Sequence, residues 1–468
     1  MAHVDELQKK YPNLPREIIV KWEMLRNGVR DSDVLSKEGT WRRPAGDFLS
    51  HDRGVTMEET AKKRPETVRQ GYLQIPGQMF MRNGIGARVM RDSRSPYQIR
   101  EESPGKYALY EGKARVENAY FNPPNHWTDE PDKEPRTSKG TPITSLITRV
   151  RRCFFLAPLR YCDFLGRGEG CKFCNYNATH DQAVAAGNKH AVALNLEETV
   201  EAYKLLASEV KLIEGRFQSG AISDVEKEAN QQFRFLERIA SGASYKPHIA
   251  MSSPPMSRKN MQRLKDAGLD GINSNIEVWD RELFAEVCPG KARHRGYDTY
   301  LQTQVDAVDV FGAGYVSCNF VGGVTQMPEN GHKTWQEGRD SLIEGLRWLI
   351  RKGVFATFHC VWLGAGSTYG DDPSSPAKIP PTEYFLDAGL AHHEACLETG
   401  LYKKLDKLLS CPMCFHGFYS GEIGMIALAG DLGNWIADAI PADANWMARF
   451  ISSMKEAQPS EGAKMGNG

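Results

Sequence analysis

The sequence lacks the features that would place it in or across a membrane. No apolar run in its 468 residues approaches the roughly 18 residues that a membrane-spanning helix needs. The opening stretch MAHVDELQKK is charged and has no apolar core of a secretory signal. Its ten cysteines are too few for a disulfide scaffold in so long a chain. Their clustering and the missing signal predict a reducing, cytoplasmic location.

The chain also lacks net charge, because 59 basic residues balance 59 acidic ones. No field of one sign therefore points to nucleic acid or to an anionic membrane as a partner. A hydrophobic content of 41% and a charged content of 25% are ordinary for a globular protein with a sizeable core. The length predicts more than one domain, or one large domain with extensions.

Three thiols stand out against this background. Cys162, Cys171 and Cys174 lie in the stretch CDFLGRGEGCKFC. Thiolates select zinc, copper(I) or iron–sulfur clusters, and glycines let a loop fold tightly enough to aim several sulfurs at one point. Four thiolates indicate a closed structural site, whereas three leave one position open for chemistry.

The end of this stretch, Cys171-Lys-Phe173-Cys174, resembles the cluster loop of radical S-adenosylmethionine (radical SAM) enzymes. The commonest family spacing is Cys-x3-Cys-x2-Cys, but here eight residues separate Cys162 from Cys171. We expect Cys162 to be the first ligand, with Cys153 as an alternative. The alternative to a cluster loop is a zinc knuckle or a set of unligated thiols.

The resemblance implies a [4Fe–4S] cluster with one iron on each of Cys162, Cys171 and Cys174, and S-adenosylmethionine on the fourth iron. An electron from a donor such as flavodoxin or ferredoxin would cleave S-adenosylmethionine to a radical that abstracts hydrogen. Such a protein is oxygen-sensitive and acts on a small-molecule substrate.

From about residue 145 strands alternate with helices, and glycines such as Gly268, Gly314 and Gly353 end helices before strands. The expected strands are 152–157, 210–217, 248–252, 271–278, 315–321 and 354–362. The expected helices are 196–208, 225–240, 257–267, 297–311 and 334–351. This α/β pattern predicts a parallel barrel or part-barrel, with an open doubly wound sheet as the alternative.

A cysteine loop after the first of six strands resembles the partial (βα)6 TIM-type barrel of the radical SAM superfamily, and most of all its biotin-synthase-related branch. Chemistry in a barrel gathers at the C-terminal ends of the strands. We expect an irregular N-terminal extension over 1–144, the barrel over 145–365, a C-terminal domain over 366–455 and a disordered tail over 456–468.

The resemblance places S-adenosylmethionine at these strand ends. After the second strand, Gln218, Ser219 and Gly220 match the family's small Gly-containing motif by position. The alternative is a βα turn in which Asp224 caps the following helix. Alternation on the fourth strand puts Asn273, Asn275 and Glu277 on one face. Asn275 and Glu277 are expected to contact ribose or carboxylate, against a buried structural network.

Four further residues are candidates for cofactor contacts on the same resemblance. They are Phe173 inside the cysteine motif, Arg293 and Arg295 after the fourth strand, and Gly322 at the end of the fifth. A solvated basic loop and an ordinary glycine turn are the alternatives.

The last hundred residues hold a second group with metal-ligand spacing. Cys411-Pro-Met-Cys414-Phe-His416 follows His392 and Cys396 in the chain. It is a candidate for a second metal site, either iron–sulfur or zinc, with a plain thiol pair as the alternative.

The sequence thus predicts a radical SAM enzyme of unknown substrate. Two other functions remain open. One is transfer of a methyl or aminocarboxypropyl group by cleaving S-adenosylmethionine elsewhere; the other is an iron–sulfur or metal assembly scaffold without radical activity.

Overall fold

The computed structural model describes residues 2–42, 53–69, 72–81, 85–121, 134–150, 153–185, 187, 191–209, 212, 214–242, 244–404 and 420. The helices are α1 (His3–Lys10), α2 (Arg16–Asn27), α3 (Asp33–Lys37), α4 (Met57–Lys63), α5 (Asp163–Gly166), α6 (Tyr176–Ala185), α7 (Leu196–Glu209), α8 (Val225–Ala240), α9 (Arg258–Asp266), α10 (Arg281–Val287), α11 (Pro289–His294), α12 (Tyr297–Phe311), α13 (Trp335–Arg351), α14 (Thr368–Asp371), α15 (Ser375–Lys378) and α16 (Thr382–Glu398). The strands are β1 (Thr40–Arg42), β2 (Val68–Arg69), β3 (Tyr72–Ile75), β4 (Gln78–Phe80), β5 (Gly86–Arg88), β6 (Tyr97–Ser103), β7 (Lys106–Glu111), β8 (Ala114–Phe121), β9 (Thr148–Val150), β10 (Cys153–Leu156), β11 (Glu214–Gln218), β12 (His248–Ser252), β13 (Gly271–Asn273), β14 (Val316–Gly322) and β15 (Phe355–Cys360).

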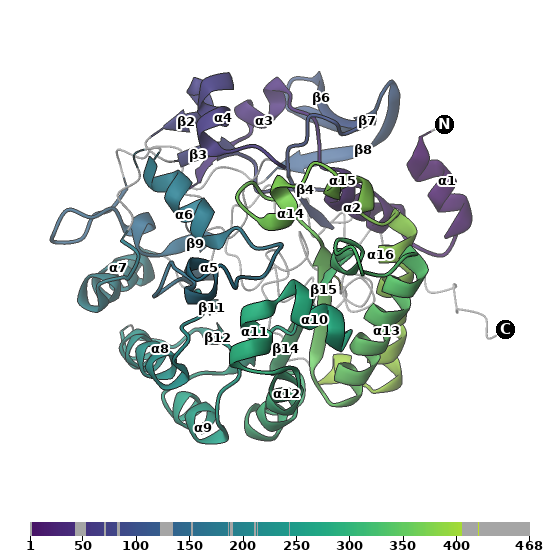
Figure 1. Cartoon of the computed structure of the whole chain (residues 1–468). Helices are drawn as coiled ribbons and strands as arrows, with labels where there is room; N and C mark the ends of the chain where they lie inside the picture. Colours follow the sequence, from purple (N-terminus) through teal and green to yellow (C-terminus); the bar gives the residue numbers. More distant parts are fainter. Residues whose placement is uncertain are drawn as a thin grey trace.

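The largest sheet has the strand order β15-β14-β13-β12-β11-β10-β9. Neighbours from β10 to β15 are parallel, and β9 pairs antiparallel with β10 at the edge. Helices α7, α8, α9, α12 and α13 follow one another around the outside of these strands (Figure 1). Because the strand order never reverses, this sheet has no switch point of the kind that a doubly wound sheet contains. The expected alternation of strands and helices is confirmed, and the doubly wound alternative is wrong.

Local sequence determines much of this region. Helices α8 and α12 have the expected ends, and Gly268, Gly314 and Gly353 all adopt the positive φ that favours glycine at a helix exit. The expected fourth strand is shorter than predicted, since β13 ends at Asn273.

The N-terminal region is more regular than the expected irregular extension. It contains a five-stranded antiparallel sheet in the order β5-β4-β8-β7-β6 and a smaller sheet in the order β1-β3-β2. The meander β6-β7-β8 turns at Gly105 and Gly112, which both have positive φ. Two-residue turns with glycine at positive φ are a common way to join antiparallel strands, and they explain the sheet. Residues 122–133 lie outside the described residues.

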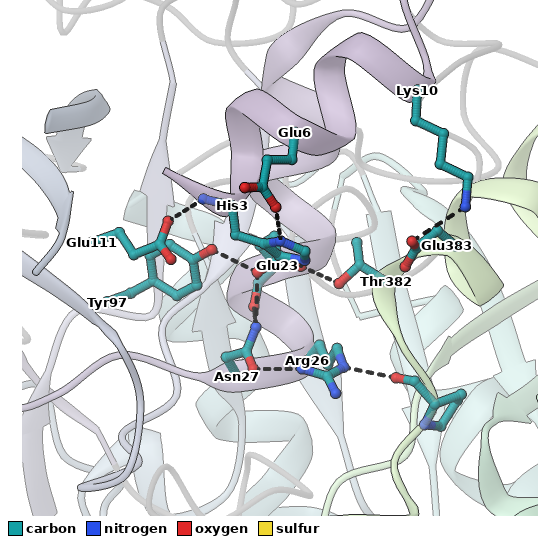
Figure 2. Close-up of polar contacts among 11 residues, drawn as sticks. His3, Glu6, Lys10, Glu23, Arg26, Asn27, Tyr97, Glu111, Thr382 and Glu383 are labelled. Carbon is teal, nitrogen blue, oxygen red and sulfur yellow. Dashed lines mark hydrogen bonds and ion pairs between the residues drawn. The ribbon is translucent and has the colours of Figure 1, made fainter. Parts of the chain in front are cut away.

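The N-terminal region packs directly on the large sheet. Trp22 of α2 is fully buried between Phe358 of β15 and Phe385 of α16, with ring centroids 5.1 and 5.2 Å away. Figure 2 shows the polar contacts around this junction. Buried Glu23 accepts a hydrogen bond from the Tyr97 hydroxyl at 2.6 Å and another from Thr382, which links α2 to both β6 and α16. None of the described helices combines the length and apolar character that crossing a bilayer requires.

Candidate functional site

The cysteine loop follows the C-terminal end of β10. Cys162 caps the short helix α5, and its backbone exchanges two hydrogen bonds with the Asn177 side chain, at 2.8 and 3.1 Å. Cys162, Cys171 and Cys174 are all partly exposed. Cys153 instead is buried as the first residue of β10, the strand that runs towards the loop.

The residues between Cys162 and Cys171 pack against α11. Phe164 of α5 stacks on His294 of α11 with ring centroids 5.2 Å apart. The Glu169 carboxylate lies 2.6 Å from the same His294 ring and forms an ion pair with Arg293. The insert therefore docks on α11 through one aromatic contact and one charged cluster.

Two backbone hydrogen bonds clamp the second half of the loop to the α10–α11 turn. Lys172 N donates to Val287 O at 2.9 Å, and Gly290 N donates to Glu169 O at 2.7 Å. The clamp brings Cys171 beside Cys288, a fully buried thiol that the sequence interpretation did not single out. A hydrogen bond with Cys288 lowers the pKa of the Cys171 thiol, whereas burial raises the pKa of Cys162 and of Cys174.

The loop after β11 touches the other side of the cysteine loop. Asp163 N donates to Ala221 O at 2.9 Å, and the Asp163 carboxylate accepts from the backbone and hydroxyl of Ser223 at 2.9 and 3.0 Å. A Cβ at Gly220 would lie 2.1 Å from Tyr161 O and 2.7 Å from Cys162 N, so only glycine fits this approach. Gln218 ends β11, and the Ser219 hydroxyl accepts a long hydrogen bond of 3.4 Å from Leu159 N.

The fourth strand carries a bulge where its polar residues were expected to line up. Ser274 N donates to Ser317 O, and Glu277 N donates to Asn319 O. The chain therefore advances by three residues here while β14 advances by two. Among the described residues, Glu277 is the only non-glycine with a positive φ, at 68°. Asn275 Oδ1 accepts from Asn319 N at 3.0 Å, which replaces a backbone contact inside the bulge. Bulges re-aim side chains, and this one turns Glu277 towards α11.

Glu277 meets Lys291 there, the second residue that the sequence interpretation missed. Lys291 Nζ donates to Glu277 Oε1 and to Asn275 O, both at 2.8 Å, and both charged side chains are largely buried. Burial lowers the pKa of Lys291, but the negative charges around it, with Glu277 the largest contributor, together raise the pKa well above its usual range. The basic run Lys291-Ala-Arg293-His-Arg295 was a signal for this partner, although it did not single out Lys291.

The remaining expected contacts have protein partners. Arg293 pairs with Glu169 at the surface, and Arg295 donates to Ser223 O at 2.9 Å and Ile222 O at 2.7 Å. Phe173 packs partly buried against the core. A Cβ at Gly322 would meet His359 O at 3.0 Å and the rings of α16, which fill that side of β14.

Three thiolates are a donor set that fits an iron–sulfur cluster. Within the described ranges, no three His, Cys, Asp or Glu side chains converge as one metal ion requires. A [4Fe–4S] cluster needs less convergence because each thiolate binds a different iron. Cys162, Cys171 and Cys174 belong to one loop after β10, and cysteine thiolates are the ligands that iron–sulfur clusters take.

The expected second metal site gains no support. Cys411, Cys414 and His416 lie outside the described residues. His392 and Cys396 contact each other on α16, with His392 Nε2 3.8 Å from Cys396 Sγ. Both are buried, and burial lowers the pKa of His392 to about 4.

Comparisons with known proteins add one curated relative. No family model matches the chain. Bacteriochlorophyllide c C-7(1)-hydroxylase from Chlorobaculum limnaeum is 23% identical over 235 residues, which are 47% of this chain and 55% of that enzyme. The chain thus matches only about half of that relative's length.

Among solved structures, methylornithine synthase (PylB) aligns with a TM-score of 0.36 and 15% identity over 54% of this chain and 69% of its own. HydG, a maturase of the [FeFe]-hydrogenase, aligns with a TM-score of 0.39 and 16% identity over 55% of this chain and 52% of its own. Structural similarity at this level does not identify the residues of the site.

Proposed function

We propose a specific chemistry for this radical SAM enzyme: it binds a [4Fe–4S] cluster through Cys162, Cys171 and Cys174 and reductively cleaves S-adenosylmethionine to act on a small organic substrate. The relationship to the superfamily and the expectation of an enzyme are confirmed by the curated hydroxylase. The biotin-synthase-related branch stays a prediction.

One observation carries the proposal. The cysteine loop lies at the C-terminal end of the first parallel strand and is clamped between the loop after β11 and the α10–α11 turn. Loops at the C-terminal ends of successive parallel strands are where barrel enzymes assemble their sites. Six parallel strands in sequence order support a partial (βα)6 barrel over 145–365. The outer domain boundaries remain predictions.

When bound, the cluster would supply the electron that breaks the sulfonium bond of S-adenosylmethionine, and the protein would supply position and exclusion of water. Gln218, Ser219 and Gly220 lie on the loop that touches Cys162, which suits a contact to a ligand of the cluster. Asn275 and Glu277 approach from the fourth strand, and no contact in the described part of the chain holds Glu277 Oε2.

Phe173, Arg293, Arg295 and Gly322 remain weaker candidates, because protein groups already occupy the surroundings of each. Hydrogen abstraction from a carbon is compatible with a hydroxylase as relative. The substrate class is left at a small organic molecule, and a flavodoxin or ferredoxin is the proposed electron donor.

The test is product analysis after anaerobic cluster reconstitution. Protein with about four irons per chain, reduced and given S-adenosylmethionine, should release 5′-deoxyadenosine. Methylthioadenosine instead would indicate cleavage at another carbon and group transfer. Iron uptake with no cleavage would favour an assembly scaffold and overturn the proposal.

A further inference from the structure

Glu277, which forms an ion pair with Lys291, has a strained backbone conformation. Glu277 holds a positive φ of 68° inside a bulge, a conformation that non-glycine residues rarely adopt. The side chains are 11% and 15% exposed, so both charges have given up most of their water. Bringing a charge pair out of water is costly, and replacement by apolar groups is often neutral or stabilising. Stability alone therefore gives little reason for such a pair here.

Its location beside the cysteine loop suggests another reason. Gly290 N is hydrogen-bonded to Glu169 O, and Lys172 N to Val287 O, so the start of α11, which carries Lys291, runs alongside Cys171. Lys291 lies next to Gly290, and its ammonium group donates to Asn275 O and Glu277 Oε1. The same ammonium group lies 5.3 Å from the centroid of the Tyr300 ring. The two charges act in opposite directions on the Cys171 thiol. The Lys291 charge favours its thiolate form, and the Glu277 charge disfavours it.

We propose that the Glu277–Lys291 pair sets the reduction potential of the cluster held by Cys162, Cys171 and Cys174. The inference rests on the proposed function, because it presumes that cluster. Reduction adds one electron from the donor and makes the cluster one unit more negative. A nearby cation stabilises that extra charge and a nearby anion destabilises it. Neither side chain gains or loses a proton or bond, so both act only through their field on the cluster.

One ion pair then yields two opposite predictions. Lys291→Met leaves the Glu277 carboxylate and should shift the midpoint potential to a more negative value. Glu277→Gln leaves the Lys291 ammonium group and should shift it to a more positive value. Lys291→Arg keeps the cation and should return the potential towards that of the wild type. A purely structural pair predicts no such opposition of sign.

The measurement is a redox titration of full-length, cluster-loaded protein, followed by the paramagnetic signal of the reduced cluster. S-adenosylmethionine is left out, so that loss of a contact between Glu277 and this molecule cannot change the measured potential. Lys246→Met is the matched control. It removes a lysine paired with Asp270 at 2.7 Å, at the opposite ends of β12 and β13 from the cysteine loop, and should leave the potential unchanged. Equal iron content and circular dichroism establish that each variant is folded and loaded.

The outcomes separate the two proposals. Shifts of opposite sign in Lys291→Met and Glu277→Gln, with an unmoved Lys246→Met, support the tuning role. Shifts of the same sign, or none, in loaded proteins overturn it while the proposed function stands. If Lys291→Met takes up no iron, Glu277→Gln decides, and a potential that fails to rise overturns the inference. A wild-type protein that binds no iron would overturn the proposed function itself.

Discussion

The three thiols of the cysteine loop occupy different environments although they are close in sequence. Cys171 faces the buried Cys288 thiol, whose hydrogen bond lowers its pKa, while burial raises the pKa of Cys162 and Cys174. Thiolates rather than thiols bind metal, so Cys171 is the residue best prepared to offer its sulfur. Cys288 contacts this proposed ligand without belonging to the loop, and substitution can separate its role from ligation.

Substitution of single cysteines should separate ligands from neighbours. Cys162→Ala, Cys171→Ala and Cys174→Ala should each abolish the visible absorbance of the reconstituted cluster and all cleavage of S-adenosylmethionine, because a three-thiolate site has no ligand to spare. Cys153→Ala and Cys288→Ala should keep the absorbance. Cys153 lies at the start of β10 rather than in the loop that follows it, and Cys288 follows α10.

An active Cys162→Ala protein beside a cluster-free Cys153→Ala protein would reverse the choice of first ligand. Loss of the cluster in Cys288→Ala, with an unchanged fold, would add Cys288 to the ligands.

At the scale of elements, the sequence predicted what depends on local pattern. Helix α12 has both expected ends because its capping glycines, Gly296 and Gly312, stand next to it in the chain. The bulge at Glu277 could not be predicted in this way. It depends on Asn319 of β14, which is distant in sequence and accepts the Glu277 N–H. Lys291 was missed for the same reason, since only the folded chain brings α11 beside the bulge.

The loop after β11 also depends on a residue outside it. Glu228 of α8 is buried, accepts a hydrogen bond from Ile222 N at 3.1 Å, and has its pKa raised by burial to about 8. Between the ordinary value of 4.5 and about 8, the folded protein therefore holds a proton that the unfolded chain has lost. The stability associated with this proton is present at low pH and is lost as pH rises through that window.

We expect Glu228→Gln to weaken this pH dependence. A glutamine can still accept from Ile222 N but never has to be ionised in the buried site. Near pH 5 the free energy of unfolding of the variant should be similar to that of the wild type. Near pH 8 it should be higher than that of the wild type by on the order of a few kcal/mol. Urea denaturation at the two pH values measures the difference, with exposed Glu237→Gln on the same helix as control. Parallel pH profiles for wild type and Glu228→Gln would contradict the role of burial.

At the scale of the whole molecule, the N-terminal region is joined to the end of the large sheet. Arg53 N donates to Arg91 O at 2.9 Å, and Gly54 N donates to Leu363 O at 3.1 Å beyond β15. The Arg53 guanidinium lies 4.7 Å over the Trp362 ring and donates to Arg26 O at 2.8 Å. No local pattern predicts such a junction, because its members come from four separate segments of the chain. The sequence predicted only an irregular extension here.

The ion pair at this junction predicts an asymmetric response to substitution. Arg53 and Asp92 are 3.1 Å apart with side chains each 5% exposed, but Asp92 has a second partner in Arg94, whose side-chain nitrogens lie 3.0 Å from its carboxylate oxygens. Arg53→Met leaves Asp92 paired and keeps an apolar stem over Trp362, so it should lower the free energy of unfolding by only about 1–2 kcal/mol. Asp92→Asn instead leaves the buried Arg53 cation without a carboxylate and should cost about 3–5 kcal/mol. Urea denaturation of both variants measures the order. Equal losses, or a larger loss for Arg53→Met, would show that Arg94 does not compensate Asp92 and that Arg53 holds the junction mainly through Arg26 and Trp362.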